Sequence, residues 1–233
     1  HSARVLPSLL ATGAGLVAAT LMPHWSHAWE TGHREQVASR QLLALKLMAL
    51  GLLSAAAMVV VAAPLLFDVA FAGKYRGGQE VLPWVLATAT WTGLAAIAFN
   101  YLWCAERLSL CAATLAVGLA VNVSCGFLLI PTFGLLGAAL AAGAGQFTQL
   151  ALVYRLSKAY GMTPDVGVWL LTAAPAMLWL GPWASLGVVA GLGLLCLATD
   201  RIFTAGEKQQ MTAFSGPFID RLRLRRPAST GGL

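Results

Sequence analysis

The sequence is poor in charged residues. Only 10% of its 233 residues are Asp, Glu, Lys or Arg, whereas 58% are hydrophobic and the mean hydropathy is +0.74. A soluble globular domain carries about 25% charged residues. The apolar residues also form blocks of about membrane length, separated by short charged patches. The composition therefore excludes a water-soluble domain and predicts an all-α, polytopic membrane protein.

Paired cysteines and catalytic motifs are also lacking. The four cysteines form no CxxC pair, and they lie in or beside apolar runs, where they act as small packing residues. The sequence contains no GxSxG, P-loop or HExxH motif. His24, His27 and His33 lie close together but lack the ligand spacing of a zinc site. We therefore predict no enzyme, no cofactor and no metal, and we interpret the stretch with Trp25 and Trp29 as an interfacial segment.

The apolar blocks predict seven transmembrane spans, because about 20 apolar residues cross the hydrocarbon core as a helix. The spans are expected at 4–23, 41–67, 81–103, 109–130, 134–155, 165–181 and 183–199. The sixth is short and is joined to the seventh by a Gly-Pro turn signal. The domain organisation is then a helical bundle over 1–200 and a basic tail over 201–233. Because the chain begins with His1 and runs at once into an apolar block, we expect a fragment of a longer protein.

The basic residues predict how the bundle is oriented. Twelve of the 15 Lys and Arg residues fall in the tail or in the loops and span ends expected on the same side of the membrane as the tail. Short loops rich in Lys and Arg stay in the cytoplasm, so the C-terminus is expected inside. The net charge of +6 does not predict nucleic-acid binding, because these residues flank apolar blocks. The tail itself fits either an amphipathic helix on the inner membrane surface or a solvated segment.

The stretch from Cys111 to Tyr154 predicts a transmembrane hairpin. Pro131 is expected to end its first arm, because proline lacks an N–H donor, and Gly134 is expected to turn the chain. Several Gly and Ala residues from Gly137 to Gly145 give the second arm a surface on which another helix can pack closely.

This hairpin also carries a resemblance to a known family. The stretch from Ile130 to Ala139 resembles the signature in the second half of bacterial polysaccharide flippases, and Asn122 matches an asparagine in the preceding arm. The stretch Phe71–Gly77 is similar to a loop motif of the same family. Leu6-Pro7, with Leu21-Met22-Pro23 a helix length later, resembles a further segment. The resemblance covers residues 5 to 200.

The resemblance implies a function. The seven spans would match the eighth to fourteenth helices of a fourteen-helix transporter in the cytoplasmic membrane, whose N-terminal lobe is missing here. Its substrate would be a lipid-linked oligosaccharide for lipopolysaccharide or exopolysaccharide synthesis. The sugar headgroup would cross through a polar cavity while the lipid tail stays in the bilayer lipids.

Other functions remain open. A lipid II flippase or a multidrug and cation antiporter belongs to the same superfamily. The antiporter normally needs an acidic residue inside a span, and none is expected here. A membrane enzyme of polysaccharide assembly and a purely structural membrane partner are the alternatives from other classes.

Polar side chains inside the predicted spans are candidates for substrate binding, because each is costly to place in lipid. They either face a water-filled cavity or join helices through hydrogen bonds. Trp91 either lines the cavity or packs between helices. These candidates are Trp91, Asn100, Asn122, Gln146 and Gln149.

Three charged residues complete the candidates. Lys46 lies one turn inside the second span, where it either attracts a diphosphate or, in the interpretation we favour, snorkels to the headgroups. Glu106 and Arg107 lie in the turn after the third span, as a solvated pair or as a gating ion pair.

Overall fold

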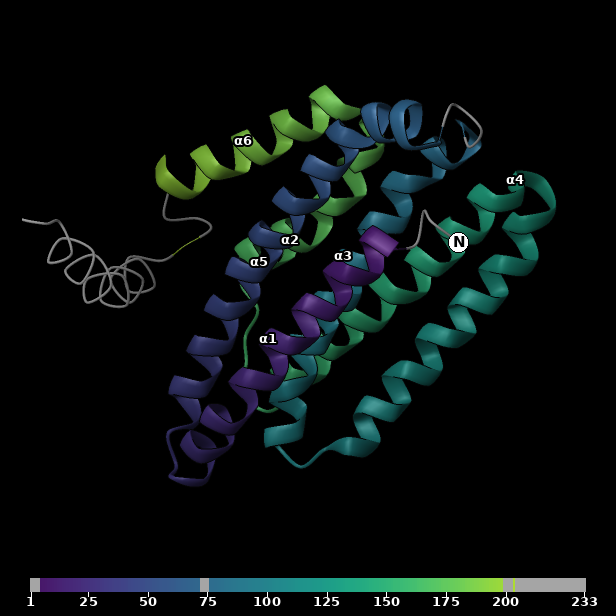
Figure 1. Cartoon of the computed structure of the whole chain (residues 1–233). Coiled ribbons are helices and arrows are strands. Elements are labelled where there is room, and N and C mark those ends of the chain that lie inside the picture. The colour runs from purple at the N-terminus through teal and green to yellow at the C-terminus, as the bar shows by residue number, and fades with distance from the viewer. Residues whose placement is uncertain (1–4, 72–75, 199–202, 204–233) are drawn as a thin grey trace, which may run out of the picture.

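The structure is a computed structural model that describes residues 5–71, 76–198 and 203, and within these residues it is all-α, without strands (Figure 1). The predicted fold class is confirmed at this level. The elements are α1 (Val5–Glu30), α2 (Arg34–Phe71), α3 (Arg76–Cys104), α4 (Leu108–Lys158), α5 (Val166–Ala173), the 3₁₀-helix η2 (Ala174–Leu180) and α6 (Pro182–Ala198). The predicted tail and the loop at 72–75 lie outside the described residues, apart from Phe203.

Four of the described helices are long and apolar enough to cross a membrane. These segments are Leu6–Glu30, Arg34–Leu65, Glu80–Cys104 and Leu108–Lys158. Two shorter apolar segments, Val166–Leu180 and Pro182–Cys196, follow them. The chain is therefore that of a membrane protein, and the count of seven spans stays a prediction.

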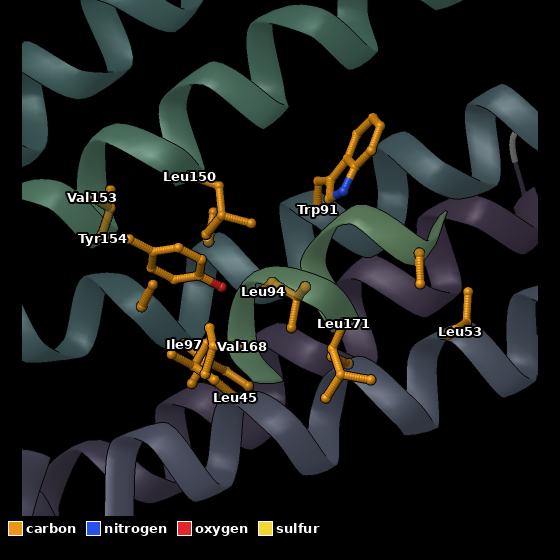
Figure 2. Packing of buried hydrophobic residues seen from close by; sticks show 14 of the residues in the cluster. Leu45, Leu53, Trp91, Leu94, Ile97, Leu150, Val153, Tyr154, Val168 and Leu171 are labelled. Atoms are coloured by element: carbon orange, nitrogen blue, oxygen red, sulfur yellow. The ribbon is translucent and has the colours of Figure 1, made fainter. Parts of the chain in front are cut away.

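Helix α3 lies at the centre of the bundle, where it contacts α1, α2 and α4. Leu86, Leu94 and Ile97 of this helix have no exposed surface. Figure 2 shows how residues of α2, α4 and α5, among them Leu45, Leu150 and Leu171, surround this helix. Most of the apolar packing therefore converges on α3.

The three turns 31–33, 105–107 and 159–164 meet at one end of the bundle. The rings of Trp29 and Tyr101 pack edge to face at 5.3 Å, and the Tyr101 hydroxyl donates to the Tyr160 carbonyl at 2.8 Å. Arg107 lies over the Tyr160 ring, 5.5 Å from its centroid. Cationic side chains gather here, so we call it the basic end, defined by Arg34, Arg40, Arg107, Arg155 and Lys158.

The predicted hairpin is present in α4. This 51-residue helix contains one non-helical residue, Gly134 (φ 56°, ψ −125°), at which the chain folds back on itself (Figure 1). The prediction that Pro131 ends the first arm is wrong, because the helix continues through it to Phe133. Proline removes only one backbone donor, whereas the reversal needs a positive φ that glycine supplies without strain.

The two arms, residues 108–133 and 135–158, touch through their backbones. A Cβ on Gly145 would lie 2.6 Å from the Gly118 carbonyl oxygen, and one on Gly137 would strike the Leu129 carbonyl. A Cβ on Gly118 would lie 3.0 Å from the Cβ of Gln149. The surface of small residues on the second arm is therefore used, at least in part, by the first arm of the same hairpin.

Two other predicted segments differ from the structure. The sixth span is a broken element, in which the eight-residue α5 passes directly into η2. The interfacial interpretation of Trp25 is wrong, because α1 continues past Pro23 to Glu30 and places Trp25 in the core, 3% exposed. Packing against α3 and its neighbours outweighs the headgroup preference of the indole ring.

The contact between the arms of α4 generates a prediction. Gly145→Leu should lower the free energy of unfolding by about 1–3 kcal/mol, because the side chain has no space against the Gly118 backbone. Unfolding in detergent micelles, followed by circular dichroism, measures this loss. Gly51→Leu in α2 is the control, because nothing lies within 4 Å of its Cβ position. Equal losses in the two variants would contradict the close contact.

Candidate functional site

The hairpin brings three of the candidate amides together. Asn122 from the first arm and Gln146 and Gln149 from the second line a groove of about 380 Å³ between the arms. We call it the amide groove, defined by these three residues. Its other walls are small or aliphatic and include Leu115, Gly118, Leu119, Ala142 and Gly145. The polar part of the groove thus consists of these amides.

Gln149 is the most enclosed of the three, with 5% of its surface exposed. Within the described part of the chain, none of the three amides has a side-chain hydrogen bond. Each primary amide offers two donors and one acceptor, so the groove presents six N–H bonds and three carbonyl oxygens to a ligand or to water. A hydroxyl-rich or anionic group is the chemistry that such a surface binds.

Asn100 lies elsewhere and joins two helices. Its Nδ2 donates to the Ala18 carbonyl of α1 at 2.7 Å, and the residue is 1% exposed. Gln41 of α2, which was not among the sequence candidates, does the same for α3, with Nε2 donating to the Ile97 carbonyl at 2.6 Å. Neither side-chain oxygen has a partner among the described residues. These two amides tie α1, α2 and α3 together and do not line the amide groove.

Trp91 also packs between helices. Its Nε1 donates to the Thr172 carbonyl in α5 at 2.7 Å, and its ring packs edge to face against Phe147 at 5.4 Å. The indole is buried, with 5% exposed. It connects α3 to the second arm of α4 and to α5.

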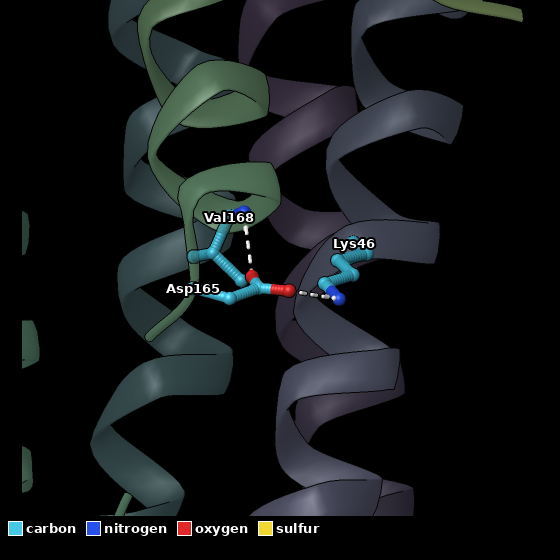
Figure 3. A network of polar contacts seen from close by, with 3 residues as sticks. All are labelled: Lys46, Asp165 and Val168. Carbon is cyan, nitrogen blue, oxygen red and sulfur yellow. Dashed lines mark hydrogen bonds and ion pairs between the residues drawn. The ribbon is translucent and has the colours of Figure 1, made fainter. Parts of the chain in front are cut away.

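Lys46 forms an ion pair inside the bundle. Its Nζ lies 2.7 Å from Oδ2 of Asp165, with the side chains 1% and 34% exposed, respectively (Figure 3). At about 1.5 Å of rise per residue, Lys46 lies about 18 Å along the axis of α2 from Arg34 at the basic end. The snorkelling interpretation is therefore wrong: the ammonium is held by a carboxylate well inside the bundle. The Phe203 ring lies 5.7 Å from the same nitrogen.

Asp165 has a second role in this pair. Its Oδ1 accepts the Val168 N–H at 3.0 Å and so caps the N-terminus of α5. Asp165 is the first residue of the sixth predicted span, and no acid is predicted in the interior of any span. An Asp directly before an apolar run is an N-cap signal, and it would have located the start of α5 but not the partner lysine.

Glu106 and Arg107 occupy the turn between α3 and α4 at the basic end. Both are exposed, and Glu106 has a positive φ of 57°. The one ion pair among the described residues is Lys46–Asp165, so these two side chains do not pair with each other. Arg107 lies instead over the Tyr160 ring.

The described residues contain no group of three or more His, Cys, Asp or Glu that could hold a metal ion. His24 and His27 are exposed on α1.

The ion pair generates a double-mutant prediction. Asp165→Asn keeps a capping oxygen but removes the charge beside Lys46, and it should cost about 3 kcal/mol of unfolding free energy. Lys46→Met should cost less, because Asp165 is 34% exposed and remains partly hydrated. The double variant should return to within about 1 kcal/mol of the parent, because a neutral pair carries no desolvated charge.

Unfolding in micelles measures all three variants. Lys158→Met is the matched control, since this exposed lysine at the basic end should change stability by less than about 0.5 kcal/mol. Additive losses in the double variant would show that the two side chains do not interact.

Comparison of the chain with protein-family models, curated proteins and solved structures gives no match. The resemblance to polysaccharide flippases therefore depends on the sequence motifs, of which the stretch from Ile130 to Ala139 forms the turn of the hairpin and Asn122 lines the amide groove.

Proposed function

We propose that the chain is part of a membrane transporter that flips a lipid-linked oligosaccharide across the cytoplasmic membrane. The observation that carries the proposal is the amide groove, which places three amides with free hydrogen-bonding capacity on an otherwise apolar hairpin. Sugar hydroxyls both donate and accept hydrogen bonds, as primary amides do, so the groove matches an oligosaccharide headgroup.

The surroundings of the groove support this proposal. Unpaired amides are costly in hydrocarbon, so the groove needs water or a polar ligand during at least part of a cycle. The outer faces of the first arm are apolar and exposed, with Val117 and Leu128 at 44% and 74%. Such faces suit lipid or a second lobe, whereas the groove suits the polar part of a substrate.

The distribution of charge supports a defined orientation. We place the basic end in the cytoplasm, because short basic loops stay on that side. The two shorter apolar segments after α4, together with the two arms of α4, would complete the seven spans and leave the C-terminus inside. The partner lobe would then come from a longer chain.

An ion-coupled antiporter of the same superfamily is the second candidate. The observation that favours it is the ion pair between the buried Lys46 and the partly exposed Asp165, because charges inside a membrane bundle commonly mark ion pathways. The objection that the span interiors contain no acid is weakened by Asp165, which stands at the start of the sixth predicted span and pairs with the buried Lys46.

Deletion of the full-length gene tests the flippase. Surface polysaccharide should be lost and lipid-linked repeat units should accumulate in the inner leaflet, because the headgroup cannot cross unaided. Unchanged glycan, combined with new sensitivity to cationic drugs, would favour the antiporter instead.

Variants of the amide groove sharpen this test. In the deletion strain, a gene copy that carries both Gln146→Leu and Gln149→Leu should restore less than about a tenth of the surface polysaccharide. The reason is that each lost hydrogen bond to the substrate removes about 0.5–1.5 kcal/mol. Ser124→Leu is the matched control, since Ser124 is exposed on the same hairpin and does not line the groove. Full restoration by the amide variant, at equal protein level, would refute a role for the groove.

A further inference from the structure

Two arginines of the basic end lie over aromatic rings. The guanidinium carbon of Arg34 is 5.1 Å from the centroid of the Trp29 ring, and that of Arg107 is 5.5 Å from the centroid of the Tyr160 ring. Both arginines are exposed, and neither forms an ion pair with another described residue. The face of a ring attracts the cation but leaves the N–H donors at the edge of the guanidinium plane available to an anion.

Acidic neighbours distinguish Arg34 from Arg107. Glu30 precedes Arg34 by four residues and Glu35 follows it directly, and both glutamates are exposed. Two carboxylates beside one guanidinium leave this part of the basic end without a surplus of positive charge. An anion is therefore not attracted to Arg34.

The two ends of α4 carry the positive charge of the basic end. Arg107 directly precedes the helix, whereas Arg155 and Lys158 lie in its last turn, three residues apart on one face. Tyr160, whose ring lies under Arg107, follows Lys158 by two residues, so the two ends of the helix meet here. The one acid directly beside these cations in the sequence is Glu106. We call Arg107, Arg155 and Lys158 the α4 cation cluster.

Exposed apolar side chains lie directly beside Arg107. The turn is tight, since the Glu106 N–H donates to the Trp103 carbonyl at 3.0 Å. Trp103 is 42% exposed and Leu108 is 66% exposed. The Trp103 ring stacks on Phe99, with 6.3 Å between the centroids, so its orientation is fixed. A ligand with both an anionic group and hydrocarbon chains matches this combination of surfaces, whereas a soluble anion would use only the cations.

We propose that the α4 cation cluster binds the phosphate of an anionic phospholipid, with Arg107 as the bidentate contact and the acyl chains beside Trp103 and Leu108. Basic pockets between membrane helices bind anionic headgroups in this way. A zwitterionic phospholipid fits less well, because the cluster repels its ammonium group. The site goes beyond the proposed function, since its ligand is a resident membrane lipid and not the transported molecule.

Lipid binding to the full-length protein in detergent micelles tests the proposal, with native mass spectrometry as the measurement. The probes are phosphatidylglycerol and phosphatidylcholine with identical acyl chains. Phosphatidylglycerol should bind about tenfold more tightly, which corresponds to about 1.4 kcal/mol. Equal binding of the two lipids would overturn the proposal.

Variants separate a built site from general attraction by positive charge. Arg107→Gln should weaken phosphatidylglycerol binding about tenfold. Tyr160→Leu keeps every charge but removes the ring under Arg107, and it should weaken binding about threefold. Arg34→Gln is the matched control, because it removes an equal charge from another exposed, ring-stacked arginine, and it should change binding less than about twofold. Equal losses in Arg107→Gln and Arg34→Gln, or no loss in Tyr160→Leu, would overturn the proposal.

Inorganic phosphate separates a lipid site from a site for free anions. Millimolar phosphate should not displace phosphatidylglycerol, because it lacks the chains that contact Trp103 and Leu108. Displacement by phosphate, with binding unchanged in a Trp103→Ala and Leu108→Ala double variant, would show a free-anion site and refute the lipid site. None of these measurements involves an oligosaccharide, so their outcome is independent of the proposed flippase.

Discussion

The backbone contact between the two arms of α4 is the constraint on which the candidate site depends. Gly118 and Gly145 bring the arms so close that no side chain fits between them. This contact places Asn122 opposite Gln146 and Gln149, which are far apart in sequence from it but share its groove. A larger residue at either glycine would push the arms apart and separate the three amides. The close packing of the arms therefore also sets the geometry of the amide groove.

A buried charge sets the second constraint. Lys46 needs a carboxylate within the bundle, and Asp165 supplies it from the first residue before α5. The start of α5 is therefore placed beside Lys46 of α2. Asp165 serves two groups at once, the ammonium of α2 and the free N–H of Val168, so the position of α5 is fixed both electrostatically and by its cap.

Most of the helices could be predicted from the sequence, whereas the roles of the polar residues in the candidate site could not. The apolar blocks predict the helices, and Gly134 predicts the reversal in α4, because both signals are local. The roles of the polar residues are not local. Asn100 and Gln149 are alike in sequence context, yet one hydrogen-bonds a neighbouring helix and the other lines a groove. The role of each amide depends on which helix lies opposite it, and the spacing of residues within one helix does not reveal the neighbouring helix. The partner of Lys46 escaped prediction for the same reason, since 119 residues separate the pair.

The turn at 159–164 ties the basic end of the bundle together. Its first residues keep local backbone hydrogen bonds, and Gly161 takes a positive φ of 101°. Met162 in this stretch is fully buried, and the Tyr160 carbonyl accepts the Tyr101 hydroxyl. The turn is therefore anchored to α3 through the Tyr101 hydroxyl and to the core through the Met162 side chain. Asp165 follows directly, so a change that opened this turn would also displace the carboxylate that pairs with Lys46.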